Sequence, residues 1–191
     1  MKTDRFRRVL LTIVLVATLL LPMVSWLLSL TGLHVRSLFS DDGLRWLFLH
    51  GASSMFGYAT QVAFFALQAI GAMRFVRLDG SEYRRFAFLM TLLVAAVFDA
   101  LLLIAIFHPR SPLVSLTGSL MPSPFLHGLP FALSVGLIIC SLVYGLITRR
   151  IRHLPSFVAF LCAGMRQFPG ELLFVMLLSH LWYAIRFICY L

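Results

Sequence analysis

The stretch MKTDRFRRVLLTIVLVATLLLPMVSWLLSL (Met1–Leu30) places basic residues directly before an apolar run that begins at Val9. A helix rises about 1.5 Å per residue, so about 20 apolar residues cross the roughly 30 Å of hydrocarbon in a bilayer. The run is long for a signal peptide, and no small-x-small cleavage pattern precedes the polar segment that follows it. We therefore interpret it as an uncleaved signal anchor and as the first transmembrane helix.

The same pattern recurs and predicts an all-α polytopic integral membrane protein with about five transmembrane helices in a single membrane domain, residues 1–191. Apolar residues make up 61% of the sequence and the mean hydropathy is +0.96, whereas soluble domains are about half apolar. No ten-residue alternation of apolar and polar residues is evident, so a membrane β-barrel is not expected. The predicted helices cover residues 9–30, 47–73, 86–107, 128–147 and 172–191.

Two further segments contain prolines and apolar residues together. Residues 155–168 carry apolar side chains at a helical period that ends at Arg166 and Gln167, which indicates an interfacial amphipathic helix or a re-entrant segment. The loop His108–His127 is rich in Pro, Ser and Gly and nearly neutral. We expect it, too, to be interfacial or partly re-entrant.

The net charge of +9 comes from basic residues that separate the apolar runs, so nucleic acid is not an expected partner. These residues concentrate before the first run, between the second and third runs, and after the fourth run, and cytoplasmic loops carry such an excess. We therefore predict a cytoplasmic N-terminus, and five crossings put the C-terminus outside. The expected anchors to the lipid of the inner leaflet are Arg7, Arg8, Arg84, Arg85, Arg149 and Arg150.

Polar side chains inside the apolar runs are the candidate functional residues. Asp99 is flanked by apolar residues, and a charge at the bilayer centre costs about 2.5–3.5 kcal/mol on insertion scales. It must therefore face the bundle, pair with another group or stay protonated, and it serves either transport with proton coupling or helix association. The expected partners of Asp99 are Gln61, Gln68 and His180.

A regular spacing connects some of these polar residues. Ser54, Gln61 and Gln68 recur every seven residues, which predicts one polar stripe on the second helix. Such a stripe suits either a hydrogen-bonded seam between helices or a substrate path. Glu171 opens the last predicted helix, where the positive end of the helix dipole favours an acid.

The sequence offers no pattern for a metal site, a cofactor site or a catalytic site. The three cysteines lack metal-ligand spacing and form no even-numbered disulfide framework. Asp99, Glu171, Ser179 and His180 are residue types used in acid–base and nucleophilic catalysis, but their spacing matches neither HExxH nor GxSxG. We expect no metal, no cofactor and no enzymatic activity.

Three segments resemble the p-aminobenzoyl-glutamate transporter (AbgT) family, in the family's order. VRSLFSDDGLRWLF (Val35–Phe48) resembles the family's loop and second-helix start. SPFLHGLPFALSVGLIICSLVYGLITRRI (Ser123–Ile151) is similar to its later short loop, helix and Val-Tyr-Gly turn. AGMRQFPGELLFVMLLSHLWYAIRF (Ala163–Phe187) is similar to the amphipathic segment and helix that come next.

The chain also departs from that family, and the departures bear on function. Family members are more than twice as long and bind substrate with helical hairpins, an architecture related to inverted repeats. Arg74 stands where the family usually has an acidic residue. The resemblance therefore implies a shortened relative in a bacterial inner membrane, with a small organic anion such as an aminobenzoyl-glutamate or a related antimetabolite as substrate.

Two functional hypotheses follow from the resemblance and from the short chain. The first is transport by a homo-oligomer or by a larger membrane complex, since a chain of 191 residues has no room for two hairpins and all the scaffold helices. The alternative is a non-transporting membrane subunit or degenerate scaffold that binds another membrane protein.

Overall fold

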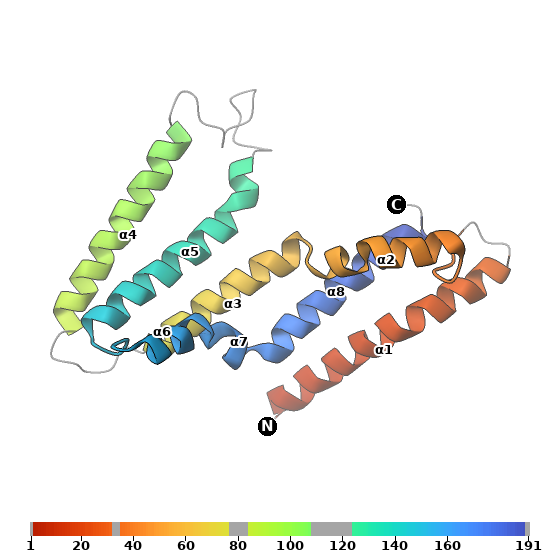
Figure 1. The fold of residues 1–191 in the computed structure, drawn as a ribbon, viewed down its shortest axis with the longest axis horizontal. Helices are drawn as coiled ribbons and strands as arrows, with labels where there is room; N and C mark the ends of the chain where they lie inside the picture. The colour runs from red at the N-terminus through yellow and green to blue at the C-terminus, as the bar shows by residue number, and fades with distance from the viewer. Residues whose placement is uncertain (1, 32–34, 77–83, 108–123, 190–191) are drawn as a thin grey trace. The chain divides into compact units, whose positions relative to one another are not determined.

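The computed structural model describes residues 2–31, 35–76, 84–107 and 124–189, and the regular secondary structure of these residues is all helical (Figure 1). The long apolar runs of the sequence account for this, because a helix satisfies the main-chain hydrogen-bonding groups of an apolar segment within the segment itself. The helices are α1 (Lys2–Leu30), α2 (Asp41–Met55), α3 (Tyr58–Val76), α4 (Arg84–Phe107), α5 (Pro124–Ile147), α6 (Leu154–Leu161), α7 (Ala163–Gln167) and α8 (Pro169–Ile188).

Five helical stretches are long and apolar enough to span a membrane, which confirms the predicted number for the described residues. The second of these stretches contains both α2 and α3, and the other four each lie in one helix. They extend over Arg5–Leu30, Asp41–Val76, Arg84–Ala105, Gly128–Ile147 and Pro169–Ile188.

Two compact units divide the chain. The first unit comprises Met1–Ala63 and Pro169–Leu191, and the second comprises Phe64–Phe168. The first therefore holds α1, α2, the start of α3 and α8, and the second holds the rest of α3 and α4 to α7. The single membrane domain over residues 1–191 stays a prediction.

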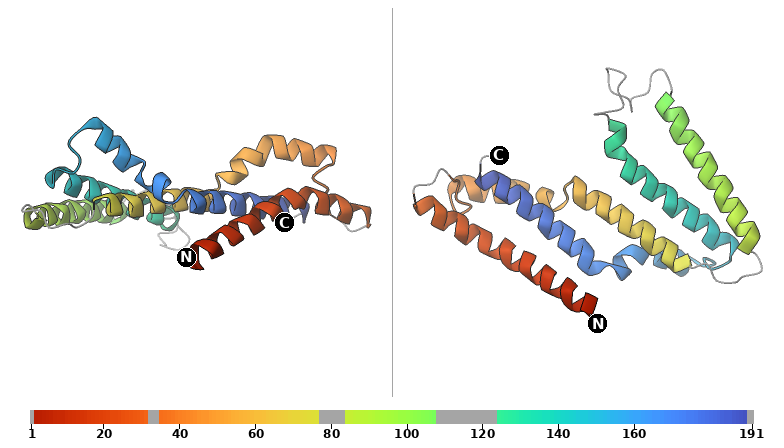
Figure 2. Two further views of the ribbon diagram at one scale, coloured as in Figure 1. Left: turned by 90° about the horizontal axis from the view of Figure 1, so that it is seen from below. Right: turned by 180° about the vertical axis from the view of Figure 1, so that it is seen from behind.

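In the first unit, α1 and α2 both pack along α8 (Figure 2). The segment between α1 and α2 is hydrogen-bonded to α8 and to α1. The Arg36 amide donates to the carbonyl of Ile188 on α8 at 3.1 Å, and the Leu38 amide donates to Ser25 Oγ on α1 at 3.1 Å. Ser25 and Leu38 are both buried. Ser25 Oγ also donates to the carbonyl of Pro22 at 2.8 Å, inside a helix that continues through this proline.

The start of α2 lies directly against this segment. Ser40 is the N-cap, and its side chain accepts a hydrogen bond from the Gly43 amide at 3.2 Å. This bond satisfies one of the amides that lack a partner within the helix. A Cβ atom on Gly43 would lie 2.4 Å from the Ser37 carbonyl oxygen, so only glycine leaves room for the main chain of that turn.

The second apolar run differs from the predicted helix over residues 47–73. α2 already begins at Asp41 and ends at Met55, and α3 begins at Tyr58. Between them the Phe56 amide turns back to the Ser53 carbonyl at 3.2 Å, which closes α2. The run is apolar on both sides of this turn, so hydropathy alone gives no sign of the interruption.

The segment predicted over residues 155–168 is also divided. α6 ends at Leu161 and α7 begins at Ala163, with Cys162 between them. The Phe160 ring is fully buried and meets the Phe75 ring edge-on, with 6.0 Å between ring centroids. This side of α6 therefore packs on α3 within the second unit.

The remaining helices of the second unit form a hairpin, α4 against α5. The two helices are in direct contact at Gly136, where an added Cβ would lie 2.7 Å from the Phe98 ring. At the end of α5 the carbonyl of Gly145 accepts the amides of Arg150 and Ile151, and this turn brings Ile151 back against Gly145. One cluster of buried apolar residues in this unit comprises Ala72, Val76, Ala87, Tyr144, Ile151 and Phe160. Most of the loop predicted over His108–His127 lies outside the described residues.

Gly43→Ala should lower the thermal unfolding midpoint of the purified protein in detergent. The new Cβ would meet main-chain atoms of Ser37 and Leu38 that cannot move without breaking the turn before α2, and overpacking of this kind costs about 1–3 kcal/mol. Gly51→Ala in the same helix is the matched control, because its Cβ would meet only the end of the Leu47 side chain at 4.0 Å. An equal midpoint for both variants would contradict this account of the turn.

Candidate functional site

Three buried polar side chains of the described residues lie at two helix interruptions, Ser54 and Ser179 in the first unit and Gln68 in the second. A helix that stops and restarts leaves carbonyls and amides without partners in the helix itself. Such groups cost free energy when buried unless side chains or water bind them. The candidate site residues of each unit are therefore best judged by the main-chain groups that they bind.

At the interruption between α6 and α7, Gln68 of α3 binds three main-chain groups. Its Nε2 donates to the carbonyl of Phe160 at 3.3 Å and to the carbonyl of Leu161. Its Oε1 accepts from the amide of Gly164 at 3.1 Å. The one amide side chain thus serves the last carbonyls of α6 and an amide in the first turn of α7, and its exposed fraction is only 7%.

A second glutamine repeats this contact in the opposite direction. Nε2 of Gln167 on α7 donates to the carbonyl of Gly71 on α3 at 3.4 Å. Between the two glutamines the helices touch main chain to main chain, because a Cβ on Gly71 would lie 2.4 Å from the Gly164 amide nitrogen. We call these four residues, Gln68, Gly71, Gly164 and Gln167, the glutamine–glycine clasp.

At the interruption between α2 and α3, hydroxyl groups take this role. Ser179 of α8 donates to the carbonyl of Ser54 at 2.8 Å, and Ser54 Oγ lies 2.7 Å from the Gly51 carbonyl oxygen and 2.7 Å from His180 Nδ1. The carbonyl can only accept, so the Ser54 hydroxyl donates to it and His180 Nδ1 must carry a proton and donate to Ser54. Nε2 is then the basic nitrogen of the neutral ring.

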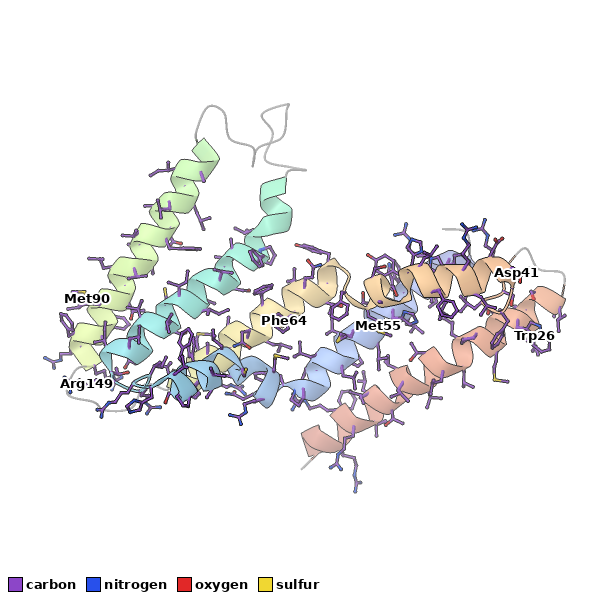
Figure 3. All side chains as sticks on the ribbon, in the orientation of Figure 1. Trp26, Asp41, Met55, Phe64, Met90 and Arg149 are labelled. Carbon is purple, nitrogen blue, oxygen red and sulfur yellow. The ribbon has the colours of Figure 1, made fainter. Side chains whose placement is uncertain are left out.

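Two more contacts complete this end of the first unit. Met55, labelled in Figure 3, is the last residue of α2, and the Phe56 carbonyl that follows it accepts from Gln61 Nε2 at 3.1 Å. An added Cβ at Gly57 would lie 2.8 Å from Oγ of Ser179 on α8, so α8 is in direct contact with the interruption. Gln61 itself is exposed.

An aromatic stack lies beside His180 on the same two helices. The Trp46 ring stacks on the Phe187 ring with 4.9 Å between centroids, and the guanidinium of Arg36 lies 5.6 Å from the Phe187 centroid. The His180 ring is 6.4 Å from Trp46 and tilted by 32°. α2 and α8 are therefore held together by ring contacts as well as by hydrogen bonds.

Asp99 is not part of either interruption as the structure describes them. Its side chain is exposed on α4, one residue after the Phe98 ring that packs on Gly136 of α5. Asp99 interacts electrostatically with Cys140 of α5. The polar groups that we expected as its partners have the contacts given above, with Gln68 bound to α6 and α7, Gln61 to Phe56 and His180 to Ser54.

Glu171 and the predicted arginine anchors lie at helix ends. Glu171, in the first turn of α8, forms an ion pair with Arg7 of α1. Arg84 and Arg85 are exposed at the start of α4. After α5, Arg149 has a left-handed φ of 57°, and Arg150 Nη1 donates to the carbonyl of Phe75 at 3.3 Å.

Residue patterns could have revealed part of what the sequence prediction missed. Gln68-Ala-Ile-Gly71 and Gly164-Met-Arg-Gln167 have the same three-residue spacing in opposite order, and each glutamine binds the glycine of the other segment. Ser54 was assigned to a stripe with Gln61, although the interruption puts the two on different helices. Among the described residues, no three His, Cys, Asp or Glu side chains are grouped so as to hold a metal ion.

Gln68→Leu should destabilise the second unit, because it leaves three buried main-chain groups without their partner and each such group costs about 1–3 kcal/mol. We expect faster maleimide labelling of Cys162, which lies at the interruption that Gln68 holds, and a lower unfolding midpoint. Gln61→Leu is the matched control, since this exposed side chain makes one hydrogen bond to a local carbonyl. An unchanged labelling rate of Cys162 in Gln68→Leu would contradict the role of Gln68 in holding the α6–α7 interruption.

The chain was also compared with known proteins. No protein-family model, no curated protein sequence and no solved structure matches it.

Proposed function

We propose that the chain is an integral membrane protein of the transport type, that it handles a small organic anion, and that it works as an oligomer. The observation that carries the proposal is the interruption at Phe56 and Gly57 within the apolar stretch Asp41–Val76. Interrupted helices occur at membrane depth where they are covered by protein or line a water-filled cavity, and transporters use them to form ion and substrate sites.

The polar contacts at this interruption support the proposal. Ser54 and Ser179 are both buried, and their hydroxyls are bound to carbonyls near the end of α2. His180 brings a titratable ring to the same place, with Nδ1 engaged by Ser54. A simple packing seam needs no broken helix, whereas a site for an ion or proton uses the freed main-chain groups and a titratable side chain.

The membrane location and the topology are supported by the arginines. Arg5, Arg7 and Arg8 lie in the first turns of α1, Arg84 and Arg85 begin α4, and Arg149 and Arg150 follow α5. Under the positive-inside rule these three groups belong on the cytoplasmic side, which puts the N-terminus in the cytoplasm of the proposed bacterial inner-membrane protein.

The choice of an organic anion rests on the resemblance to the p-aminobenzoyl-glutamate transporter family. Two of the similar segments, Val35–Phe48 and Ala163–Phe187, include residues that contact each other in the first unit, as the Trp46–Phe187 stack and the packing of α2 on α8 illustrate. The residues that resemble the family therefore include the packed helices α2 and α8, and α8 carries His180.

Transport can be tested with labelled p-aminobenzoyl-glutamate in cells that express the wild type, Asp99→Asn or an empty vector. We expect the wild type to change the cellular content of the label, and Asp99→Asn to reduce the rate about tenfold, the equivalent of about 1.4 kcal/mol in the barrier. Asp42→Asn is the matched control, because it makes the same chemical change at an exposed position in the first turn of α2. Rates equal to those of the empty vector for every variant would overturn the transport proposal.

The exposed Asp99 favours a second candidate function, that of a membrane subunit bound to another membrane protein. A carboxylate on an apolar spanning helix is expensive unless a protein or water faces it, and Asp99 is exposed in the described structure. Asp99→Leu should then release a stoichiometric partner during purification in mild detergent, while Asp42→Leu retains it. A homo-oligomer with saturable ligand binding and no second protein would count against the subunit function.

A further inference from the structure

A carboxyl group lies on the exposed, mostly apolar surface of α4. Asp99 is exposed, and it belongs to the apolar stretch Arg84–Ala105, which is long enough to span a membrane. Asp99 follows Arg84 by fifteen residues and precedes Ala105 by six, which are about 22 Å and about 9 Å along a helix. Both distances exceed the reach of an aspartate side chain, so in a membrane this carboxyl group lies within the hydrocarbon.

Asp99 has no ion-pair partner among the described residues. It interacts electrostatically with the Cys140 thiol of α5, a group that carries no positive charge. A carboxyl group inside a bilayer is costly unless protein or water faces it. The side of α4 that carries Asp99 therefore needs a partner that lipid tails do not provide.

The residues on this side of α4 are spaced for packing against another helix. Leu92, Ala96, Asp99 and Leu103 are all exposed, and they follow one another at intervals of four, three and four residues. Two helices that pack side by side meet along residues with this alternation. The small side chain of Ala96 lets a second main chain come close, one turn before the carboxyl group. We call these four residues the α4 seam.

Exposure alone does not single out the seam. Leu93, Val97 and Leu101 on another side of α4 have exposed fractions of 57%, 52% and 60%, against 57% for Leu92 and 53% for Leu103. Lipid tails are as apolar as leucine, so leucine side chains gain little when they leave lipid for a second helix. The carboxyl group is therefore what distinguishes the seam from the rest of the helix surface.

We propose that the α4 seam is the contact between two copies of this chain, which pack in parallel around a two-fold axis with the two Asp99 carboxyl groups sharing a proton. Copies inserted with the same topology run α4 in the same direction, so a two-fold contact brings each seam residue opposite its own equivalent. A protonated carboxyl group donates a hydrogen bond and a carboxylate accepts one, so Asp99 is complementary to its own copy.

The charges of the chain favour this pairing over an ion pair between copies. The basic residues of the described spanning stretches lie close to the ends of those stretches, so a second copy offers no arginine at the depth of Asp99. A proton shared by two carboxyl groups also leaves one negative charge instead of two inside the hydrocarbon. The inference rests on the proposed membrane insertion and names the interface of the proposed oligomer.

Disulfide cross-linking in membranes tests which side of α4 meets the second copy. The full chain would carry alanine at its three native cysteines and one new cysteine on α4. We expect cross-linked dimers from cysteines on the seam, because a two-fold contact puts the equivalent Cβ atoms close together. Cysteines on the other exposed side are the matched controls and should give no dimer. The seam variants are Leu92→Cys, Ala96→Cys and Leu103→Cys, and the controls are Leu93→Cys, Val97→Cys and Leu101→Cys.

A second measurement tests the carboxyl group itself. Energy transfer between labelled copies of the purified chain, diluted with lipid in vesicles of phosphatidylglycerol and phosphatidylcholine, reports the strength of the dimer. Asp99→Leu should weaken the dimer about tenfold, because it removes the hydrogen bond between the copies. Asp99→Asn should retain the strength of the dimer within about twofold, because a carboxamide both donates and accepts. Equal dimer strength in Asp99→Leu and the wild type would overturn the role of the carboxyl group.

The remaining outcomes separate this interface from the proposed function. Equal cross-linking on both sides of α4 would overturn the interface and leave the oligomer in place, whereas a monomeric wild type in the vesicles would overturn both. Loss of a different membrane protein from Asp99→Leu during purification, with a monomeric wild type in vesicles, would assign the seam to that protein. Uptake of labelled p-aminobenzoyl-glutamate is measured separately, because a seam dimer without uptake would sink the transport proposal alone.

Discussion

The packing of the second unit depends on the need of main-chain carbonyls and amides for partners where a helix stops. Between α6 and α7 the main chain leaves its own hydrogen-bond ladder, and Gln68 alone serves two carbonyls and one amide there. This is within reach only because Gly71 and Gly164 let the two helices meet at main-chain distance. The glycines and the glutamines thus act together. The close approach at the glycines brings the hydrogen-bonding groups within reach, and the hydrogen bonds then hold the two helices together.

The first unit meets the same need with different chemistry. A hydroxyl has one proton, so Ser54 donates to Gly51 and then depends on His180 for its remaining contact. Ser179 has to serve the Ser54 carbonyl separately. A carboxamide such as that of Gln68 carries both donors and an acceptor, so one side chain can bind carbonyls and an amide at the same time. The hydroxyl and imidazole arrangement instead divides the donors and acceptors between two side chains, Ser54 and His180.

Hydropathy predicted the helical class and the number of long apolar helices, because these depend on the average character of about 20 residues. It did not predict the ends of α2 and α3, because residues 47–73 are apolar on both sides of Phe56 and Gly57. The seven-residue stripe of Ser54, Gln61 and Gln68 presupposed one unbroken helix. Gln68 was selected for the right reason, a buried polar side chain in an apolar run. Its partners were missed because they are main-chain atoms, which are present at every residue, and only the spacing of Gly71 and Gly164 marks the place of close approach.

The arginines that indicate topology also stabilise the ends of helices. Arg150 donates to the Phe75 carbonyl in the last turn of α3, where the negative end of the helix dipole lies. Arg74, in the same turn, covers the Phe168 ring at 4.9 Å. Arg7 neutralises Glu171 at the start of α8. The long apolar stem of arginine lets its guanidinium reach groups at a helix end. Arginines from which the sequence predicts the topology thus also form hydrogen bonds and ion pairs in the folded protein.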